Sequence, residues 1–376
     1  MLRILHLADL HLGWAPSYLG GEKKKVRLRE RNQLLAKAVD FALSPGNDIH
    51  AVFIVGDLFE DYRPDESLVR QVLDNLGRLT TAGLRVITVP GNHDEITYRD
   101  SVYRQHGANW PGELVVNPMP ELSVSVEVNG TGLHVYALAF TGGLTIVSSI
   151  EKFPRKDLPG LHIGAFHGSL DWEGVADRSL PLKSGLLKEA GYDYIALGHI
   201  HRYTEKTVGK GMAVYPGAAE FKSFNDPGTG GLVVAEYSGG RIKIEKAELD
   251  IRRHQIRNLE LSGLEGADDL LETCKSFADP EAMVQLTFKG TPPFHFGEEQ
   301  LLDALEPYFF YIEIKNETEY FSDTFLESLA QEPTVRGNFV RRLRKKQATA
   351  ENEQERKLLG QAMRKGLAAL QGVDQV

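Results

Sequence analysis

Nine polar residues in five short clusters are the part of this sequence best suited to chemistry. The clusters are Asp9-Leu10-His11, Gly56-Asp57, Gly91-Asn92-His93-Asp94, His167-Gly168 and Gly198-His199-Ile200-His201. They supply three carboxylates, one carboxamide and five imidazoles, and they contain no thiol. Such oxygen and nitrogen donors suit a pair of divalent transition ions, whereas a structural zinc site usually includes cysteine. The sequence therefore predicts a dinuclear metal centre.

Taken singly, each cluster is weak evidence for a functional site, because short motifs arise by chance and pairs such as Gly-Asp and His-Gly are usually turns. A lone histidine on a strand is also more often a core residue than a ligand. All five clusters follow apolar runs, and it is their joint occurrence that favours metal binding over these structural explanations.

Two ions about 3.5–4 Å apart can clamp a phosphate, activate a bridging water and stabilise the leaving oxygen. The expected reaction is therefore in-line hydrolysis of a phosphate ester. Asp57 is the carboxylate that could bridge the ions, and Asn92 offers a neutral amide oxygen. His93 is predicted to protonate the leaving group or to stabilise charge on the phosphoryl oxygens. Asp94 is predicted to orient an imidazole and to raise its basicity.

The sequence around these clusters predicts alternating strands and helices. Five aliphatic runs predict strands buried on both faces: Leu2–Leu7, Ala51–Val55, Arg85–Val89, Leu161–Phe166 and Tyr194–Leu197. Helical spacing marks Leu28–Leu43 and Asp65–Ala82, and hairpins are expected within 122–139 and 231–245. Because the carboxyl ends of strands in an α/β sheet share one rim, we expect the clusters to converge there.

The composition bounds the rest. A chain of 376 residues with 42% hydrophobic and 25% charged residues is typical of a globular protein with two or three domains. We expect domains at 1–250, 251–318 and 319–376, the second a β-α-β-α-β module and the third a charged helical tail. The single cysteine fits a reducing, cytoplasmic location, and we expect neither a signal peptide nor a membrane span. The net charge of −9 means that a nucleic acid would have to meet local basic patches.

Over residues 5–201 the motifs D-x-H, G-D, G-N-H-D, H and G-H-x-H stand in the order found in calcineurin-like metallophosphoesterases, which the chain resembles. The resemblance implies an α/β metallophosphoesterase β-sandwich flanked by helices, here with a small α+β capping domain and a helical C-terminal tail. It implies His93 as the catalytic residue and two Mn²⁺ ions, although other divalent ions are possible. The ligands it implies are Asp9, His11, Asp57 and His201 for one ion, and Asp57, Asn92, His167 and His199 for the other.

Within that family the chain resembles the SbcD-type DNA repair nucleases. The likeness lies in I-L-H-L-A-D-L-H-L-G, in G-D-L-F-E and in A-L-G-H-I-H followed by Tyr215-Pro216-Gly217. It implies a manganese-dependent DNA exonuclease and endonuclease of double-strand break repair, a homodimer whose tail binds an SMC-like coiled-coil ATPase. Some relatives carry a histidine where this chain has Glu60, which puts in question the role of that position and the balance of exonuclease and endonuclease action.

Basic residues after the first cluster are candidates for DNA phosphate contacts, with a solvated surface charge run as the alternative. The candidates are Lys24, Lys25, Arg27 and Arg31. A second basic group at residues 341–346 lies in a segment that we expect to be an amphipathic helix docking on a partner. Two other functions stay open: a phosphodiesterase for small molecules or lipids that uses the same site, and an inactive scaffold. The presence of every ligand and of His93 disfavours the scaffold.

Overall fold

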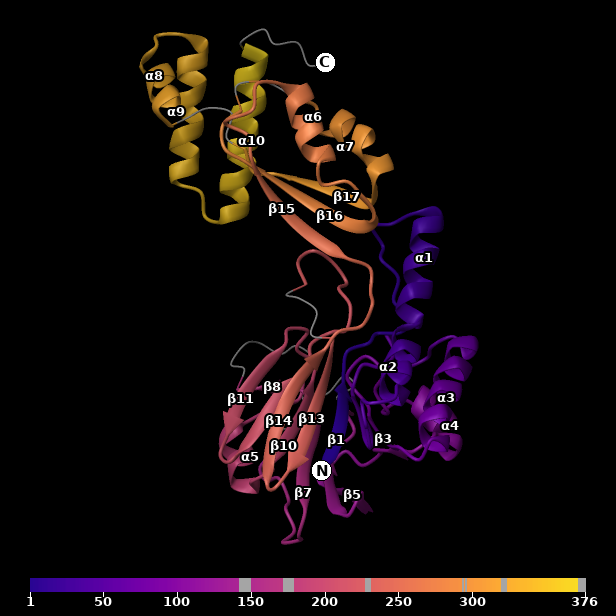
Figure 1. The fold of residues 1–376 in the computed structure, drawn as a ribbon. Coiled ribbons are helices and arrows are strands. Elements are labelled where there is room, and N and C mark those ends of the chain that lie inside the picture. Colours follow the sequence, from indigo (N-terminus) through magenta and orange to yellow (C-terminus); the bar gives the residue numbers. More distant parts are fainter. Residues whose placement is uncertain are drawn as a thin grey trace. The chain divides into compact units, whose positions relative to one another are not determined.

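The computed structural model describes residues 1–141, 150–171, 179–226, 231–292, 294, 296–318 and 323–370. The chain divides into two compact units, Met1–Ile251 and Arg252–Val376 (Figure 1). The first unit contains all five polar clusters.

A six-stranded sheet with the order β14-β13-β1-β2-β3-β4 forms one layer of the first unit. Its strands are β1 (Leu2–Leu7), β2 (Ala51–Val55), β3 (Arg85–Val89), β4 (Glu113–Leu114), β13 (Leu232–Ser238) and β14 (Arg241–Ala247). The three strands that precede the first three clusters are neighbours and run parallel, β1 with β2 and β2 with β3. Their carboxyl ends therefore lie at the same edge of the sheet.

A second six-stranded sheet has the order β11-β12-β10-β7-β6-β5. Its strands are β5 (Glu121–Val128), β6 (Thr131–Ala137), β7 (Leu161–His167), β10 (Tyr194–Gly198), β11 (Thr204–Val208) and β12 (Gly211–Tyr215). Strands β7 and β10, which precede the last two clusters, are also parallel neighbours. The short strands β8 (Ser169–Leu170) and β9 (Pro181–Leu182) pair separately.

The two sheets share one apolar core. It contains Val52 and Ile54 from the first sheet together with Val135, Ile163 and Ala196 from the second. These side chains are almost fully buried, and alternate residues of each strand point into the space between the sheets. This arrangement confirms the predicted α/β fold with two facing sheets.

The first unit also contains helices. They are α1 (Gly21–Asn32), α2 (Leu34–Leu43), α3 (Glu66–Thr81), α4 (Val102–His106) with the 3₁₀ turn η1 (Gly107–Asn109), and α5 (Ser184–Ala190). Helices α2, α3 and α4 lie together on one side of the first sheet (Figure 1), where α2 and α3 add leucine and valine side chains to the core. Helix α5 packs on the second sheet through Leu187, against Phe166 and Ile195.

The five strands expected from aliphatic runs agree with the structure to within one residue at each end, but the first expected helix does not. The predicted helix Leu28–Leu43 is two helices that meet at Gln33, and the first of them begins at Gly21. Helix α1 buries Arg27 and Arg31. Apolar periodicity cannot detect a helix that docks through arginines, so the prediction missed its first two turns.

The second unit begins with a three-stranded parallel sheet that carries two helices. In chain order the elements are β15 (His254–Glu260), α6 (Ala267–Lys275), β16 (Asp279–Lys289), α7 (Glu298–Leu305), η2 (Glu306–Tyr308) and β17 (Phe309–Asn316). Their shared core includes Leu270, Val284 and Leu305. The order of elements is the β-α-β-α-β pattern expected for this segment.

Three helices follow: α8 (Asp323–Gln331), α9 (Val335–Ala348) and α10 (Glu353–Leu370). They pack on one another through a small apolar cluster of Leu329, Val340, Met363 and Leu367. Part of the apolar set expected to dock on a partner is thus used between these helices. Within the described residues, no helix combines the length and the apolar character needed to cross a membrane.

Helix α3 offers a test of the packing. Leu76 is fully buried in the shared core, so Leu76→Ala should lower the free energy of unfolding by about 2–5 kcal/mol through lost contacts and the cavity left behind. Gln71→Ala, on the exposed face of the same helix, should change it by no more than about 0.5 kcal/mol. Urea denaturation followed by circular dichroism measures both, and equal effects would contradict the packing described here.

Candidate metal centre

The loops that carry the clusters are held together by main-chain hydrogen bonds. The Asp9 N–H donates to the Gly56 carbonyl oxygen at 3.1 Å, and the His11 N–H donates to the Asp57 carbonyl oxygen at 2.9 Å. On the second sheet, the Gly168 N–H donates to the Gly198 carbonyl oxygen at 3.1 Å. Each loop is therefore aligned with the next by backbone groups, independently of its polar side chains.

Four of the residues predicted as ligands have backbone conformations that are unusual for residues other than glycine. The φ angle is 55° at Asp9, 48° at His11, 51° at Asp57 and 101° at His199. Such conformations cost free energy and persist at functional sites because the surrounding structure imposes them. Here they occur where strands β1, β2 and β10 end, so the chain turns sharply as it delivers each ligand.

One half of the site is formed by Asp9, His11 and His201. Their ligand atoms all lie within 4.8 Å of one another. The Nε2 atoms of His11 and His201 are 3.1 Å apart, so both rings present the same nitrogen to the same point. The Asp9 carboxylate also accepts the His199 N–H at 3.0–3.1 Å, which ties the first cluster to the last.

The other half is formed around the side-chain oxygen of Asn92. His167 Nε2 lies 3.0 Å from this oxygen, and His199 Nδ1 lies 2.9 Å from it. The structure therefore brings together Asn92, His167 and His199, which are the residues that the family resemblance grouped around one ion with Asp57.

Asp57 lies between the two halves. Its Oδ2 is 3.8 Å from His11 Nε2 and 3.4 Å from His167 Nε2, and its ligand atom lies within 4.8 Å of those of Asp9 and His167. Burial opposes ionisation, but His167 and His11 outweigh it and hold the pKa of Asp57 well below its ordinary value. Asp57 is therefore an anion placed where one carboxylate can serve two cations.

Glycines permit this close approach. A Cβ atom on Gly91 would lie 2.2 Å from Asp57 Oδ1, and a Cβ atom on Gly56 would lie 2.0 Å from His167 Nδ1. Both distances are far below van der Waals contact. A side chain at Gly56 or Gly91 would therefore displace a candidate ligand.

His93 lies at the accessible edge of the cluster, with 38% of its side chain exposed. Its N–H donates to Asp57 Oδ1 at 2.9 Å, and its ring Nδ1 lies 3.0 Å from the carbonyl oxygen of Glu60. With Nδ1–H donated to that carbonyl, Nε2 is the ring nitrogen left to face a substrate.

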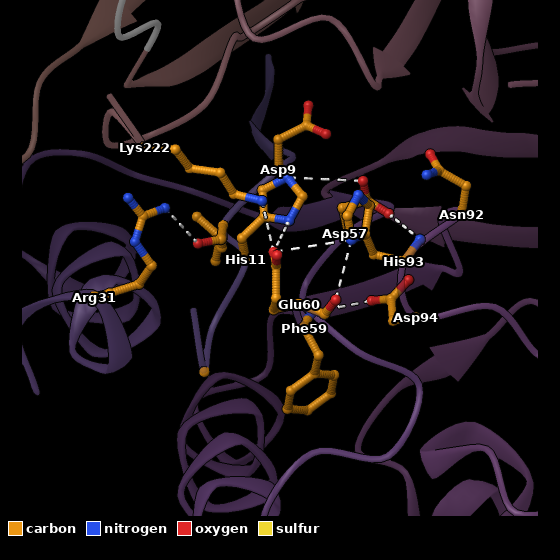
Figure 2. Close-up of polar contacts among 12 residues, drawn as sticks. Asp9, His11, Arg31, Asp57, Phe59, Glu60, Asn92, His93, Asp94 and Lys222 are labelled. Atoms are coloured by element: carbon orange, nitrogen blue, oxygen red, sulfur yellow. Dashed lines mark hydrogen bonds and ion pairs between the residues drawn. The ribbon is translucent and has the colours of Figure 1, made fainter. Parts of the chain in front are cut away.

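The prediction that Asp94 orients an imidazole is wrong. Its carboxylate accepts the N–H groups of Gly91 at 2.7 Å and Phe59 at 3.1 Å, and the hydroxyl of Tyr103 at 2.7 Å. Figure 2 shows the Phe59 contact. Burial, reinforced by Asp57, raises the pKa of Asp94 to about 6. Asp94 thus holds together the loops that carry Asp57 and Asn92. Its carboxylate oxygens are hydrogen-bonded to main-chain N–H groups and to Tyr103 rather than to an imidazole.

Two residues outside the predicted set, Glu60 and Asp226, contact candidate ligands, and a third, Lys222, contacts both of them. Glu60 Oε2 lies 2.8 Å from His11 Nδ1, and the Lys222 ammonium donates to the same oxygen at 2.6 Å (Figure 2). Asp226 Oδ2 lies 3.2 Å from His201 Nδ1. Burial disfavours the charged form of Glu60, but His11 and Lys222 prevail and lower its pKa to about 2. Only Glu60 gave a sequence signal, as a departure from relatives; Lys222 and Asp226 belong to no motif.

The basic residues predicted to contact DNA fall into two classes. Lys24 and Lys25 are exposed. Arg27 and Arg31 are buried, and their guanidinium groups lie 2.7 Å and 3.4 Å from the carboxylate of Glu220. A guanidinium enclosed against a buried carboxylate cannot reach a phosphate, so the proposed DNA contact is wrong for these two arginines. They dock helix α1 on the segment after β12.

The donor set fits divalent cations. Buried carboxylate oxygens, one amide oxygen and imidazole nitrogens converge from five loops, and hard or borderline ions prefer these ligands. Without cations, the buried and closely spaced polar atoms would repel one another or stay poorly solvated. Residues Asp9, His11, Asp57 and His201 would hold one ion, and Asp57, Asn92, His167 and His199 the other.

Gly91→Ala tests the crowding at Asp57. The added methyl group must push the Asp57 carboxylate from its position, so the variant should lose most of its bound Mn²⁺, measured by elemental analysis after dialysis. Gly77→Ala is the matched control, because a Cβ atom there meets no atom within 4 Å. It should retain full metal content and gain up to about 1 kcal/mol of stability in helix α3. Full metal content in Gly91→Ala would show that Asp57 is not constrained as described.

Comparisons with known proteins agree with this geometry. Residues 2–203 match the family model of the calcineurin-like phosphoesterases. The chain is 24% identical over 370 residues to the uncharacterized metallophosphoesterase YhaO of Bacillus subtilis, covering 94% of this chain and 83% of YhaO.

Two further relatives are DNA double-strand break repair proteins named Mre11. Identity is 22% over 296 residues with the protein of Methanopyrus kandleri and 28% over 280 residues with that of Aeropyrum pernix. These matches cover 72% and 68% of this chain, and 61% and 63% of the two relatives, so it spans less than two thirds of either. The family match covers more than half of the chain and contains every candidate ligand: the protein belongs to the calcineurin-like phosphoesterase family, the metal-dependent hydrolases of phosphate esters.

Proposed function

We propose that this protein is a manganese-dependent DNA nuclease, with exonuclease and endonuclease activity, that acts in double-strand break repair. The observation that carries the proposal is the convergence of seven donor side chains beside the accessible ring of His93. Similarity to the Mre11 proteins supports DNA as the substrate. A cytoplasmic location fits this function and the single, buried cysteine.

Two bound divalent cations would supply Lewis acidity for the phosphate and lower the pKa of an attacking water. The residues of the chain would position these cations and exclude bulk water from the site. Asp57 keeps the two halves of the site in register, because it contacts a histidine of each. Burial of Asp9, Asp57 and His167 excludes bulk water and strengthens every electrostatic interaction with the substrate.

His93 is the proposed proton donor to the leaving oxygen. The Glu60 carbonyl engages Nδ1, which fixes the ring and directs Nε2 toward the open side of the site. A histidine so placed contributes through general acid catalysis, or through a hydrogen bond to the charge that develops on the phosphoryl oxygens.

We further propose that the protein acts as a homodimer with an SMC-like coiled-coil ATPase. The helices α8, α9 and α10 are the proposed ATPase-binding segment, because they keep apolar side chains exposed after packing on one another. Val335 and Leu358 are 74% and 64% exposed. Helix α9 also carries exposed basic residues, including Arg341 and Lys345, which suit an acidic partner.

His93→Ala should lower manganese-dependent cleavage of linear double-stranded DNA by about 10²–10⁴-fold, because the proton donor is lost. Metal content should stay unchanged, since the ligand side chains remain. His106→Ala is the control: this imidazole pairs with Glu66 at 3.5 Å and should be dispensable.

The same assay separates the proposal from a small-molecule or lipid phosphodiesterase. If the protein cleaves bis-p-nitrophenyl phosphate but leaves DNA intact, even with its ATPase partner present, the nuclease assignment is wrong and the phosphodiesterase alternative stands.

Lys24 and Lys25 are proposed to contact DNA phosphates. Changing both to alanine should weaken DNA binding and reduce the slope of log affinity against log salt by about two, because each phosphate contact releases about one counterion. Fluorescence anisotropy over a salt series measures the slope. Lys243→Ala, which removes an equally exposed lysine from strand β14, is the control. An unchanged slope in the double variant would exclude helix α1 from the DNA-binding surface.

A further inference from the structure

The two histidines of the first half of the site, His11 and His201, are supported in the same way. Their Nε2 atoms face each other at 3.1 Å, so both Nδ1 atoms point outward. His11 Nδ1 meets the carboxylate of Glu60 at 2.8 Å, and His201 Nδ1 meets the carboxylate of Asp226 at 3.2 Å. Each imidazole therefore has a carboxylate oxygen within 3.2 Å of its outer nitrogen.

Lys222 joins these two carboxylates. Its ammonium donates to Glu60 Oε2 at 2.6 Å, and its main-chain N–H donates to Asp226 Oδ2 at 3.1 Å. Figure 2 shows the Glu60 carboxylate linked to His11 and Lys222. The adjacent Phe221 carbonyl accepts a hydrogen bond from the buried Arg31 at 2.6 Å. One anchored segment of chain thus fixes both carboxylates.

The second half of the site is supported by neutral groups. The outward Nδ1 of His167 lies 3.0 Å from the carbonyl oxygen of Val55, and Asn92 contributes an uncharged amide oxygen. The two halves share Asp57 but differ in the charge behind their imidazoles. A carboxylate behind an imidazole fixes its tautomer, with the proton on the outer nitrogen, and makes the inner nitrogen a stronger donor.

We propose that Glu60 and Asp226, joined by Lys222, are positioning residues that make the half of the site containing His11 and His201 bind its ion more tightly than the half containing Asn92 and His167. The inference rests on the proposed dinuclear function and deepens it. The two ions would then load in order, and at low metal concentration the protein would hold a single ion that depends on Glu60 and Asp226.

Glu60 acts behind His11 rather than as an additional ligand. Its Oε2 is engaged by both His11 and Lys222, and the contact with His11 is to the nitrogen that faces away from His201. A histidine at this position would offer no anion to His11.

Titration of the metal-free, full-length protein with Mn²⁺ by isothermal calorimetry tests the proposal. We expect two binding steps of different affinity in the unmodified protein. Glu60→Gln and Asp226→Asn keep the size of each side chain but remove its charge, and each should weaken the tighter step by about 10–100-fold while changing the weaker step by less than about 3-fold. Asn92→Ala should weaken the other step.

Asp61→Asn is the matched control. It removes the same charge one residue from Glu60, but its carboxylate accepts the Arg63 N–H at 2.8 Å rather than meeting a histidine. Both binding steps should stay unchanged in this variant. The melting temperature of each metal-free variant shows whether the substitution destabilises the fold. A merely structural effect would lower the melting temperature and weaken both Mn²⁺-binding steps equally.

Indistinguishable binding steps in the unmodified protein, or equal weakening of both steps in Glu60→Gln and Asp226→Asn, would overturn the inference. So would unchanged binding in both variants. Absence of any Mn²⁺ binding would overturn the proposed function as well. Two unequal steps that respond as expected, in a protein that never cleaves DNA, would support the inference and refute the nuclease assignment alone.

Discussion

The burial of the Asp57 carboxylate constrains the whole site. A buried anion is costly unless it is surrounded by hydrogen-bond donors and cations. Asp57 accepts the His93 N–H and contacts His11 and His167, and the absence of a side chain at Gly91 makes room for it. Since these partners come from three loops besides that of Asp57 itself, the position of one carboxylate sets the positions of all of them.

The sandwich makes this convergence possible because neighbouring parallel strands end at a common edge in both sheets. Strands β1, β2 and β3 deliver the first three clusters, and β7 and β10 deliver the other two. The shared apolar core holds the sheets face to face. The positive φ angles at Asp9, His11 and Asp57 raise the free energy of the folded state. The packing of the core must offset this cost, so the stability of the core allows the ligands to keep their strained positions.

Beyond the ligands, the segment after β12 determines how the histidines are held. Glu220 binds the buried Arg27 and Arg31, while Lys222 contacts the carboxylate of Glu60 and Asp226 contacts the imidazole of His201 at the candidate metal centre. Helix α1 and the metal centre therefore share one short stretch of chain. The arginines are structural, and of the four basic residues proposed from the sequence only Lys24 and Lys25 remain available to a phosphate backbone.

The sequence by itself determined the buried strands and the candidate ligands, because both depend on local patterns. Short runs of β-branched and aliphatic residues such as Ala51–Val55 favour buried strands, and candidate ligands such as Asp57 follow shortly after them in the chain. Only the tertiary structure decided the pairing of Glu60 with Lys222, 162 residues apart, the role of Asp94 as a brace, and the burial of Arg27. Charged side chains have no periodicity that reveals their partners, since an exposed and a buried arginine look alike until the chain has folded around them.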